Sequence, residues 1–167
     1  MNRIERIRAA KAAMDAEAMA EAEKKNKNIT KFTNAVKALS DRLNELMVVG
    51  DEMFKNRISF GGTFYTCGMA HGEKFESNGI THELGFIFEY YRGKRVKLIG
   101  IGIKGGGCCG NDIVINREGE IITNPLDHVF GCWTEENAYD DFCSKVAKVI
   151  YGFDAFEKKF YDYVDSL

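Results

Sequence analysis

The side chains best suited to metal or thiol chemistry lie in two short segments of the middle of the chain. Cys108 and Cys109 are adjacent in a glycine-rich stretch, and Cys67 stands four residues before His71. Thiolate sulfur and imidazole nitrogen are the ligands of tetrahedral zinc, so together these residues could hold a metal ion. The same thiols could serve as nucleophiles if a base lay beside them. A thiol- or zinc-dependent enzyme is therefore one alternative function.

Neither the adjacent Cys108-Cys109 nor the pair Cys67 and His71 has the C-x2-C spacing that marks strong zinc motifs. Thiols without such a motif are more often small buried groups of a protein core. We therefore expect no metal and no cofactor.

A second candidate is a cluster of positive charges on a predicted hairpin. Its basic residues are Arg92, Lys94, Arg95 and Lys97, and the aromatic residues beside them are Tyr90 and Tyr91. Such a hairpin can contact phosphates or an acidic protein surface, and its rings can stack on bases. Lysine and arginine also protect an exposed strand from pairing with other chains. We take the six residues as candidate partner-binding residues, and a nucleic-acid-binding module as another alternative function.

A third candidate is the string Gly100-Ile101-Gly102-Ile103-Lys104-Gly105, which matches G-x-G-x-x-G. The dinucleotide-binding fingerprint requires a helix after the glycines, whereas here another predicted strand follows, so we interpret the segment as a hairpin. Gly100 and Gly102 are expected to share a strand face with Val96 and Leu98. The bare face that they leave would admit a helix or a ligand, and we favour a helix.

Composition limits the class of protein. The 167 residues suit one domain, and 45% hydrophobic with 29% charged residues is typical of a globular chain. A net charge of -2 argues against a general nucleic-acid binder. The sequence has no apolar run of signal-peptide or membrane-spanning type, and its five cysteines are odd in number. We expect a cytoplasmic protein with reduced thiols and no membrane contact.

Helical patterns occupy both ends of the chain. Residues 3–25 are rich in alanine and other helix formers, and residues 30–54 carry apolar side chains at heptad spacing. The heptad residues are Ile29, Phe32, Val36, Leu39, Leu43 and Leu46. The polar residues 24–28 predict a hinge between these two helices. Residues 134–167 predict a further amphipathic helix, with Thr134 as its N-cap and a kink or end at Gly152.

The middle of the chain predicts strands. Apolar and polar residues alternate over 58–64, 84–90, 96–104, 112–117 and 120–123, which is the period of a strand. Gly93 and Gly119 mark tight turns between neighbouring strands. Strands joined by such short turns must be antiparallel, so about five of them form a meander.

The expected fold is α+β: long N-terminal helices, an antiparallel meander, and a long C-terminal helix packed with the N-terminal helix. Residues 1–57 carry 12 basic and 9 acidic side chains, whereas residues 134–167 carry 4 and 8. Opposite charge favours packing between these two ends. We expect a single domain over 1–167, with a helical arm over 1–56, a sheet over 57–124 and the C-terminal helix over 134–167.

The expected function is non-enzymatic. A chain without a catalytic motif, but with open helical seams and a basic hairpin, suits an accessory or inhibitor protein that binds another protein or a nucleoprotein complex. Small phage and mobile-element proteins that block host defence complexes, such as anti-CRISPR proteins, share this general character. Nucleic acid alone is not the expected partner. The apolar stripe of residues 29–46 and the aromatic stripe of Phe153, Phe156, Phe160 and Tyr163 offer more apolar helix surface than one five-stranded sheet covers, so a homodimer through the helical seams is a further expectation.

Overall fold

The computed structural model describes residues 2–60, 73–77, 80–92, 94–103, 113–123 and 135–167. Its helices are α1 (Arg3–Lys37), α2 (Ser40–Lys55) and α3 (Glu135–Asp165). Its strands are β1 (Glu73–Ser77), β2 (Ile80–Tyr91), β3 (Lys94–Ile103), β4 (Ile113–Ile115) and β5 (Ile121–Thr123). The expected α+β class is confirmed.

The strands form an antiparallel meander in the order β1-β2-β3-β4-β5. Four of the five predicted strands correspond to β2 through β5, and the predicted turn at Gly119 lies between β4 and β5. The first predicted strand, over 58–64, is wrong at residues 58–60, which belong to no strand, and its residues 61–64 lie outside the described residues. Strand β1 occupies Glu73–Ser77, where no strand was predicted. The apolar alternation near Ile58 and Phe60 has another cause, because Phe60 packs its ring against Phe86, Phe156 and Phe160 of the core.

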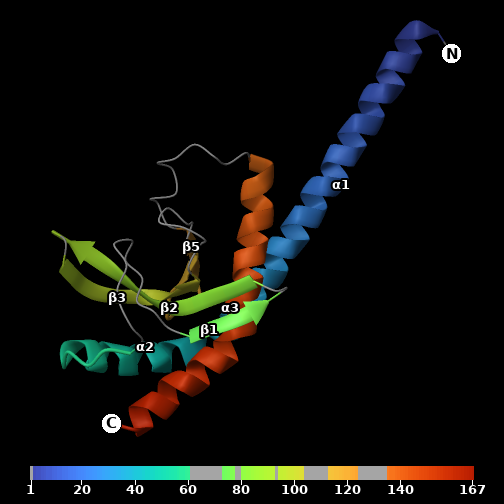
Figure 1. The fold of residues 1–167 in the computed structure, drawn as a ribbon. Coiled ribbons are helices and arrows are strands. Elements are labelled where there is room, and N and C mark those ends of the chain that lie inside the picture. The colour runs from blue at the N-terminus through green and yellow to red at the C-terminus, as the bar shows by residue number, and fades with distance from the viewer. Residues whose placement is uncertain (1, 61–72, 78–79, 93, 104–112, 124–134) are drawn as a thin grey trace.

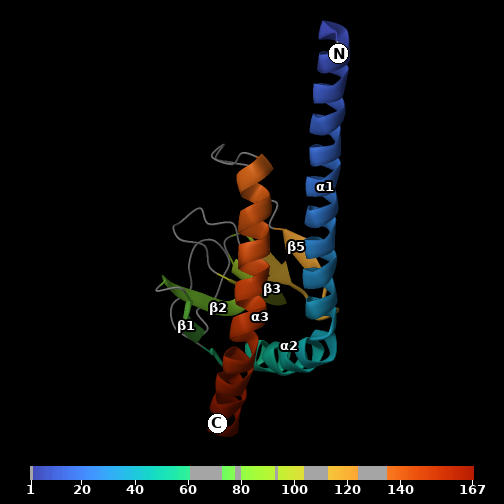
Figure 2. The same ribbon diagram turned by 90° about the vertical axis from the view of Figure 1, so that its right-hand side faces the viewer.

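The helices cover one face of the sheet, and α1 extends far beyond it (Figures 1 and 2). Helix α2 crosses beneath the strands, while α3 lies beside α1 and runs in the same direction. A single core cluster joins Val36 of α1, Leu43 and Leu46 of α2, and Phe156 of α3. The predicted packing of the N- and C-terminal helices is thus confirmed.

The predicted hinge at residues 24–28 is wrong, because α1 continues through it without interruption. Two ion pairs link this segment to the preceding turn of α1, each between residues four positions apart. Lys25 Nζ lies 3.0 Å from Glu21 Oε1, and Lys27 Nζ lies 2.9 Å from Glu23 Oε1. Pairs at this spacing stabilise a helix by about 0.2–0.5 kcal/mol each. Polar composition therefore did not break the helix here.

The chain turns instead at Ala38 and Leu39, between α1 and α2. The heptad residues are divided by this corner: Ile29, Phe32 and Val36 end α1, whereas Leu39 and the later positions belong to the start of α2. The turn of the β4–β5 hairpin fills the corner. There Lys37 Nζ donates a hydrogen bond of 2.9 Å to the carbonyl of Glu118, and a Cβ on Gly119 would lie 3.2 Å from the Val36 carbonyl oxygen.

Helix α3 is continuous through Gly152, which is buried, so the helix does not end at that residue. The alternative prediction of a kink agrees with the change of direction of the α3 axis in Figure 1. Thr134 lies outside the described residues. One side chain joins α2 to α3: Arg42 donates to Asp154 at 2.7 Å and to both carboxylate oxygens of Glu157, and its guanidinium lies over the Phe153 ring at 4.8 Å. The hydrogen bonds from Arg42 to Glu157 and then to Asp154 raise the pKa of the Arg42 guanidinium above its usual value.

The glycines of β3 face a neighbouring strand, which corrects the prediction that they make room for a helix. A register shift between Ile87 and Phe88 puts Leu98 on the helix-covered face and Gly100 and Gly102 on the other face. A Cβ on Gly100 would lie 2.4 Å from the carbonyl oxygen of Ile115. The glycine that lets a helix approach the sheet lies in α2, where a Cβ on Gly50 would lie 3.1 Å from Leu98 Cδ2.

Within the described part of the chain, no helix has an apolar stretch sufficient to span a membrane.

Candidate binding groove

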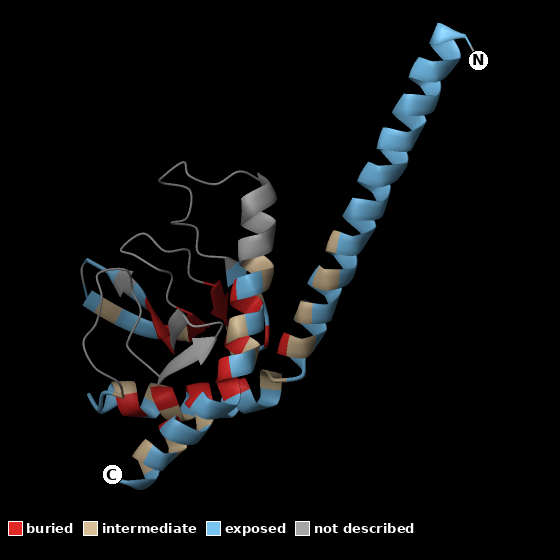
Figure 3. Cartoon of the chain, turned by 45° about the vertical axis from the view of Figure 1, so that its right-hand side comes forward, coloured by how far each residue is buried: buried red, intermediate tan, exposed pale blue. Residues whose placement is uncertain are grey.

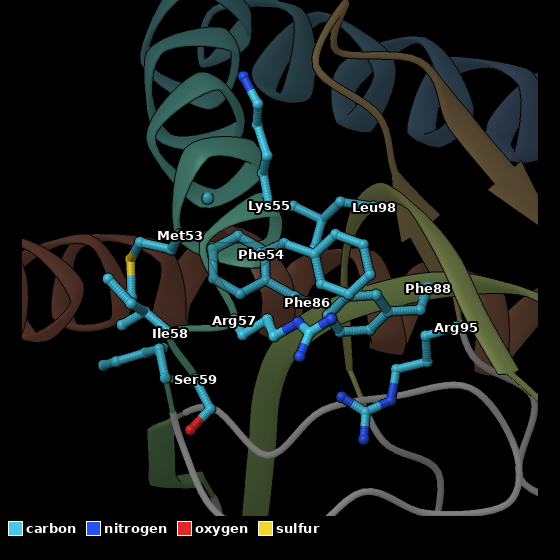
Figure 4. A pocket seen from close by; sticks show the side chains of 12 residues that line it. Met53, Phe54, Lys55, Arg57, Ile58, Ser59, Phe86, Phe88, Arg95 and Leu98 are labelled. Carbon is cyan, nitrogen blue, oxygen red and sulfur yellow. The ribbon is translucent and has the colours of Figure 1, made fainter.

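A cavity of about 440 Å³ opens between the C-terminal end of α2 and strands β2 and β3 (Figure 4). Its lining residues are Gly50, Met53, Phe54, Lys55, Arg57, Ile58, Ser59, Phe60, Phe86, Phe88, Arg95 and Leu98. We call this feature the cationic groove, because three of its residues are basic and none is acidic. A concave, mostly apolar site with a few charged groups at its edge is the usual form of a binding site.

Phenylalanine rings form the floor of the cationic groove. The rings of Phe54 and Phe88 lie 5.2 Å apart in a tilted arrangement, so the end of α2 is packed directly on β2. The ring of Phe86 contacts those of Phe156 and Phe160 at 5.5 and 5.3 Å. The floor is thus an extension of the protein core, which holds it rigid beneath the charged edge.

The cations come from two elements. Lys55 and Arg57 follow from the end of α2, where the negative end of the helix dipole favours positive charge. Arg95 comes from β3, and its guanidinium lies 5.2 Å from the centre of the Phe88 ring. In Figure 4 the guanidinium groups of Arg57 and Arg95 lie on the same side of the phenylalanine rings, whereas Lys55 extends away from them.

Arg57 has an unusual backbone conformation that the end of α2 imposes. Its N–H donates to the Phe54 carbonyl at 3.0 Å, and the next N–H, of Ile58, donates to the Met53 carbonyl at 2.8 Å. This hydrogen-bond pair is a Schellman motif, in which glycine normally fills the left-handed position. Here arginine fills it, with φ of 60°. A side chain in this conformation costs about 1 kcal/mol relative to glycine.

Arg92 shows the same anomaly at the tip of the β2–β3 hairpin. Its φ is 50°, and Arg57 and Arg92 are the two residues other than glycine with positive φ in the described ranges. Two-residue hairpin turns usually place asparagine, aspartate or glycine at such a position. Both positions carry an arginine. Arg57 lines the cationic groove, and Arg92 lies at the tip of the hairpin whose strand β3 contributes Arg95 to the groove.

The predicted hairpin residues adjoin this groove. Arg95 lines it, and its neighbours Arg92, Lys94 and Lys97 are exposed on the same hairpin. Tyr91 is exposed as well, with the Arg92 guanidinium 5.2 Å from the centre of its ring. Tyr90 pairs with Arg95 in the strand register. The hairpin thus contributes one basic side chain to the cavity and carries three exposed ones beyond it.

Sequence reasoning missed the part of the site that α2 contributes, namely Phe54, Lys55 and Arg57. Only the fold places the end of α2 beside β3. One signal was present in the sequence: the predicted helix ends near residue 54, and Asn56-Arg57 follows it with no glycine to stop the helix.

The thiol and metal candidates, Cys67, His71, Cys108 and Cys109, all lie outside the described residues. Among the residues that the structure does describe, no group of three or more His, Cys, Asp or Glu side chains could hold a metal ion. The one described free cysteine is Cys143 of α3, which is partly buried. The thiol- or zinc-dependent alternative stays a prediction.

Comparison with known proteins found no family model, no curated protein and no solved structure that matches this chain.

Proposed function

We propose that this chain is a non-enzymatic binding protein whose cationic groove takes an acidic segment of a partner protein or nucleoprotein complex. The observation that carries the proposal is the pair of arginines held at positive φ, Arg57 and Arg92. Strained backbone positions tend to cluster at functional sites, where the strain is retained for what the side chain does. At both positions glycine would suit the backbone better, so the guanidinium groups need another reason to be there.

The charge and shape of the surface indicate the kind of partner. The groove contributes the guanidinium groups of Arg57 and Arg95 and no acidic side chain, and the hairpin adds Arg92, Lys94 and Lys97. Lys55 extends away from the phenylalanine rings and pairs with Glu52 at 3.6 Å. This positive surface extends past the cavity, so it suits a ligand larger than a metabolite. Phe54 and Phe88 provide an apolar floor on which one hydrophobic side chain of the partner would be anchored. The ligand is therefore an acidic peptide segment with an apolar anchor.

A stoichiometric binder of this kind would act as an accessory or inhibitor protein. Positive charge on the hairpin would accelerate encounter with the acidic partner, and the groove would then determine how long the complex lasts. The expectation that the partner is a host defence complex stays a prediction.

The proposal is tested by selection from a displayed library of random peptides on the immobilised full chain. We expect enriched peptides to combine Asp or Glu with Phe, Leu, Met or Trp. Binding of the best peptide is then measured by fluorescence polarisation for wild type and Arg57→Gly. The glycine variant should raise Tm by about 3 °C, since it relieves about 1 kcal/mol of strain. It should also weaken peptide binding about tenfold, as expected for one charge-assisted contact.

Lys31→Gln is the matched control, because it removes one exposed positive charge on α1, away from the groove. This control should change peptide binding by less than about twofold. Enrichment of neutral or basic peptides, or unchanged binding by Arg57→Gly, would contradict the proposal. Tighter binding of a single-stranded oligonucleotide than of any peptide, with a steep dependence on salt, would favour the nucleic-acid alternative instead.

A further inference from the structure

Helix α1 carries one continuous stripe of residues from the body of the protein to its free end. The stripe positions are 4, 7, 11, 14, 18, 22, 25, 29, 32 and 36, and all but Lys11 and Lys25 are apolar. With about 100° per residue in an α-helix, these positions stay within about 40° of a common line. Phe32 and Val36 pack this stripe onto the core.

The outer half of the same stripe has no cover. Residues 3–24 are all exposed, and they project away from the body (Figure 3). The side chains of Ile4, Ile7 and Met14 are 61%, 69% and 70% exposed. The free end is nevertheless specified as helix, because Asn2 and Glu5 form a capping box: the Glu5 N–H donates to Asn2 Oδ1 at 2.9 Å, and the Asn2 N–H donates to Glu5 Oε2 at 2.7 Å.

Charge is segregated along this projecting arm. Residues 3–11 hold four basic side chains and one acidic side chain, whereas residues 15–23 hold four acidic side chains and no basic one. The change of sign falls near residue 13, the middle of the arm. A second identical arm is complementary to this pattern only when it runs antiparallel, because a parallel copy would place like charges side by side.

We infer that the exposed stripe of α1 is covered by α1 of a second copy of this chain, in antiparallel orientation. An antiparallel seam centred near residues 12 and 13 places Ile7 against Ala18 of the second copy, so that a large residue meets a small one. It also places Arg8 beside Asp15 of the second copy, while Arg3 comes within reach of Glu21 of the second copy. The two-fold axis repeats each pair, which gives four ion pairs along the seam.

The residues of the proposed seam specify how the two helices are aligned more than they strengthen the dimer. Lys11 lies within the stripe near the two-fold axis, and a single polar residue in a helical seam specifies its register at some cost in stability. The aliphatic part of lysine can lie along the seam while its ammonium group reaches solvent. We therefore expect a reversible dimer that dissociates on dilution and that presents two cationic grooves.

The test measures the mass of the full chain by sedimentation equilibrium across protein concentrations of about 1–500 μM. Wild type should show a monomer–dimer equilibrium. Its dissociation constant should rise about tenfold between 0.05 and 0.5 M NaCl, because four exposed ion pairs of about 0.4 kcal/mol each are screened.

Two charge-reversal variants make the test specific. Arg3→Glu/Arg8→Glu and Asp15→Lys/Glu21→Lys should each be monomeric alone, because like charges then meet across the antiparallel seam. An equimolar mixture of the two variants should form a heterodimer, because opposite charges meet again.

Far-UV circular dichroism should show that each variant is as helical as wild type. The matched control is Arg6→Glu/Glu23→Lys, which also exchanges charges on α1 but lies away from the stripe; this control should still dimerise.

Three results would each overturn the inference. Wild type could stay monomeric at the highest concentration in low salt. A chain lacking residues 1–24 could dimerise as strongly as wild type, which would place the contact elsewhere. The two charge-reversal variants could each dimerise as wild type does. None of these results would affect the peptide-binding test, because the arm and the cationic groove are separate surfaces.

Discussion

Replacing glycine by alanine at Gly100 should destabilise the protein strongly, whereas the same replacement at Gly50 should change its stability little. At Gly100 the added Cβ would lie 2.4 Å from the carbonyl oxygen of Ile115 and 2.7 Å from Val114 Cγ1. The first distance is about 1 Å shorter than an ordinary contact of about 3.5 Å. The atom it meets belongs to the backbone, so β4 itself would have to move away from β3.

The loss of stability that this movement causes follows from the hydrogen bonds between β3 and β4 and from the burial of Ile115. Among the described residues, strand β4 pairs with β3 at Ile101↔Ile115 and Gly102↔Val114. A shift of about 1 Å would break hydrogen bonds of about 1 kcal/mol each. Ile115 is fully buried and would be displaced from the core, and overpacking of this kind costs about 1–3 kcal/mol. We expect Gly100→Ala to destabilise the protein by about 3 kcal/mol.

At Gly50 the added Cβ would meet flexible side chains instead. It would lie 3.1 Å from Leu98 Cδ2 and 3.2 Å from Phe86 Cε1, and both residues line the cationic groove, which gives them room to yield. Alanine also favours helix over glycine by about 1 kcal/mol. The two effects oppose each other, so Gly50→Ala should change the free energy of unfolding by less than about 1 kcal/mol.

Urea unfolding followed by far-UV circular dichroism compares wild type with both variants. With an m-value of about 2 kcal/mol per molar urea, Gly100→Ala should lower the midpoint by about 1.5 M, and Gly50→Ala should lie within about 0.5 M of wild type. A Gly100→Ala variant that unfolds at the wild-type midpoint would refute the close approach of β3 and β4. Equal losses in both variants would refute the argument that the groove side chains can yield.

Three further outcomes follow from the contacts of α3. Arg42→Met should destabilise the protein by about 1 kcal/mol in thermal unfolding, because the ion pairs are half exposed but form a network with a ring contact. Glu157→Gln should cost more than Asp154→Asn, since their side chains are 19% and 82% exposed; the reverse order would contradict the network. Tyr161→Phe should stabilise the protein by about 1 kcal/mol near pH 7, because it removes a buried hydroxyl with no hydrogen-bond partner. Burial, with a smaller effect of Glu45 and Glu157, raises the pKa of Tyr161 above 10.0. The unfolded chain therefore loses this proton first as the pH rises above 10, so wild type should lose stability there more steeply than Tyr161→Phe; parallel profiles for the two proteins would contradict this.

The candidate site was predictable only in part. The basic hairpin follows from local sequence, since Arg92 and Lys94 flank a glycine between two alternating strands. That half of the surface needed no knowledge of distant residues. The other half, Phe54, Lys55 and Arg57, comes from a helix end more than thirty residues earlier in the chain. Its position beside β3 depends on how α2 packs across the sheet, which no local pattern encodes.

Secondary structure and fold class were determined by the sequence itself. Period-two alternation specified β2 to β5, and alanine content with apolar spacing specified the three helices, because these patterns reflect backbone geometry and the need to bury one face. Antiparallel order followed from the short turns. The position of β1 did not follow in this way. The alternation at residues 58–60 misled, because Phe60 packs its ring on the core without belonging to a strand.

Only the tertiary structure decided where the helices turn and which face each strand presents. The break between α1 and α2 falls at Ala38, where the β4–β5 turn packs, and not at the polar residues 24–28, which ion pairs keep helical. The bulge next to Leu98 shifts the alternation of β3 by one residue, so Gly100 and Gly102 lie on the face opposite to Leu98. There they lie close to the backbone of β4. The corner at Ala38 and the faces of β3 depend on contacts between residues far apart in the chain, whereas propensity and periodicity report only on residues within a few positions of one another.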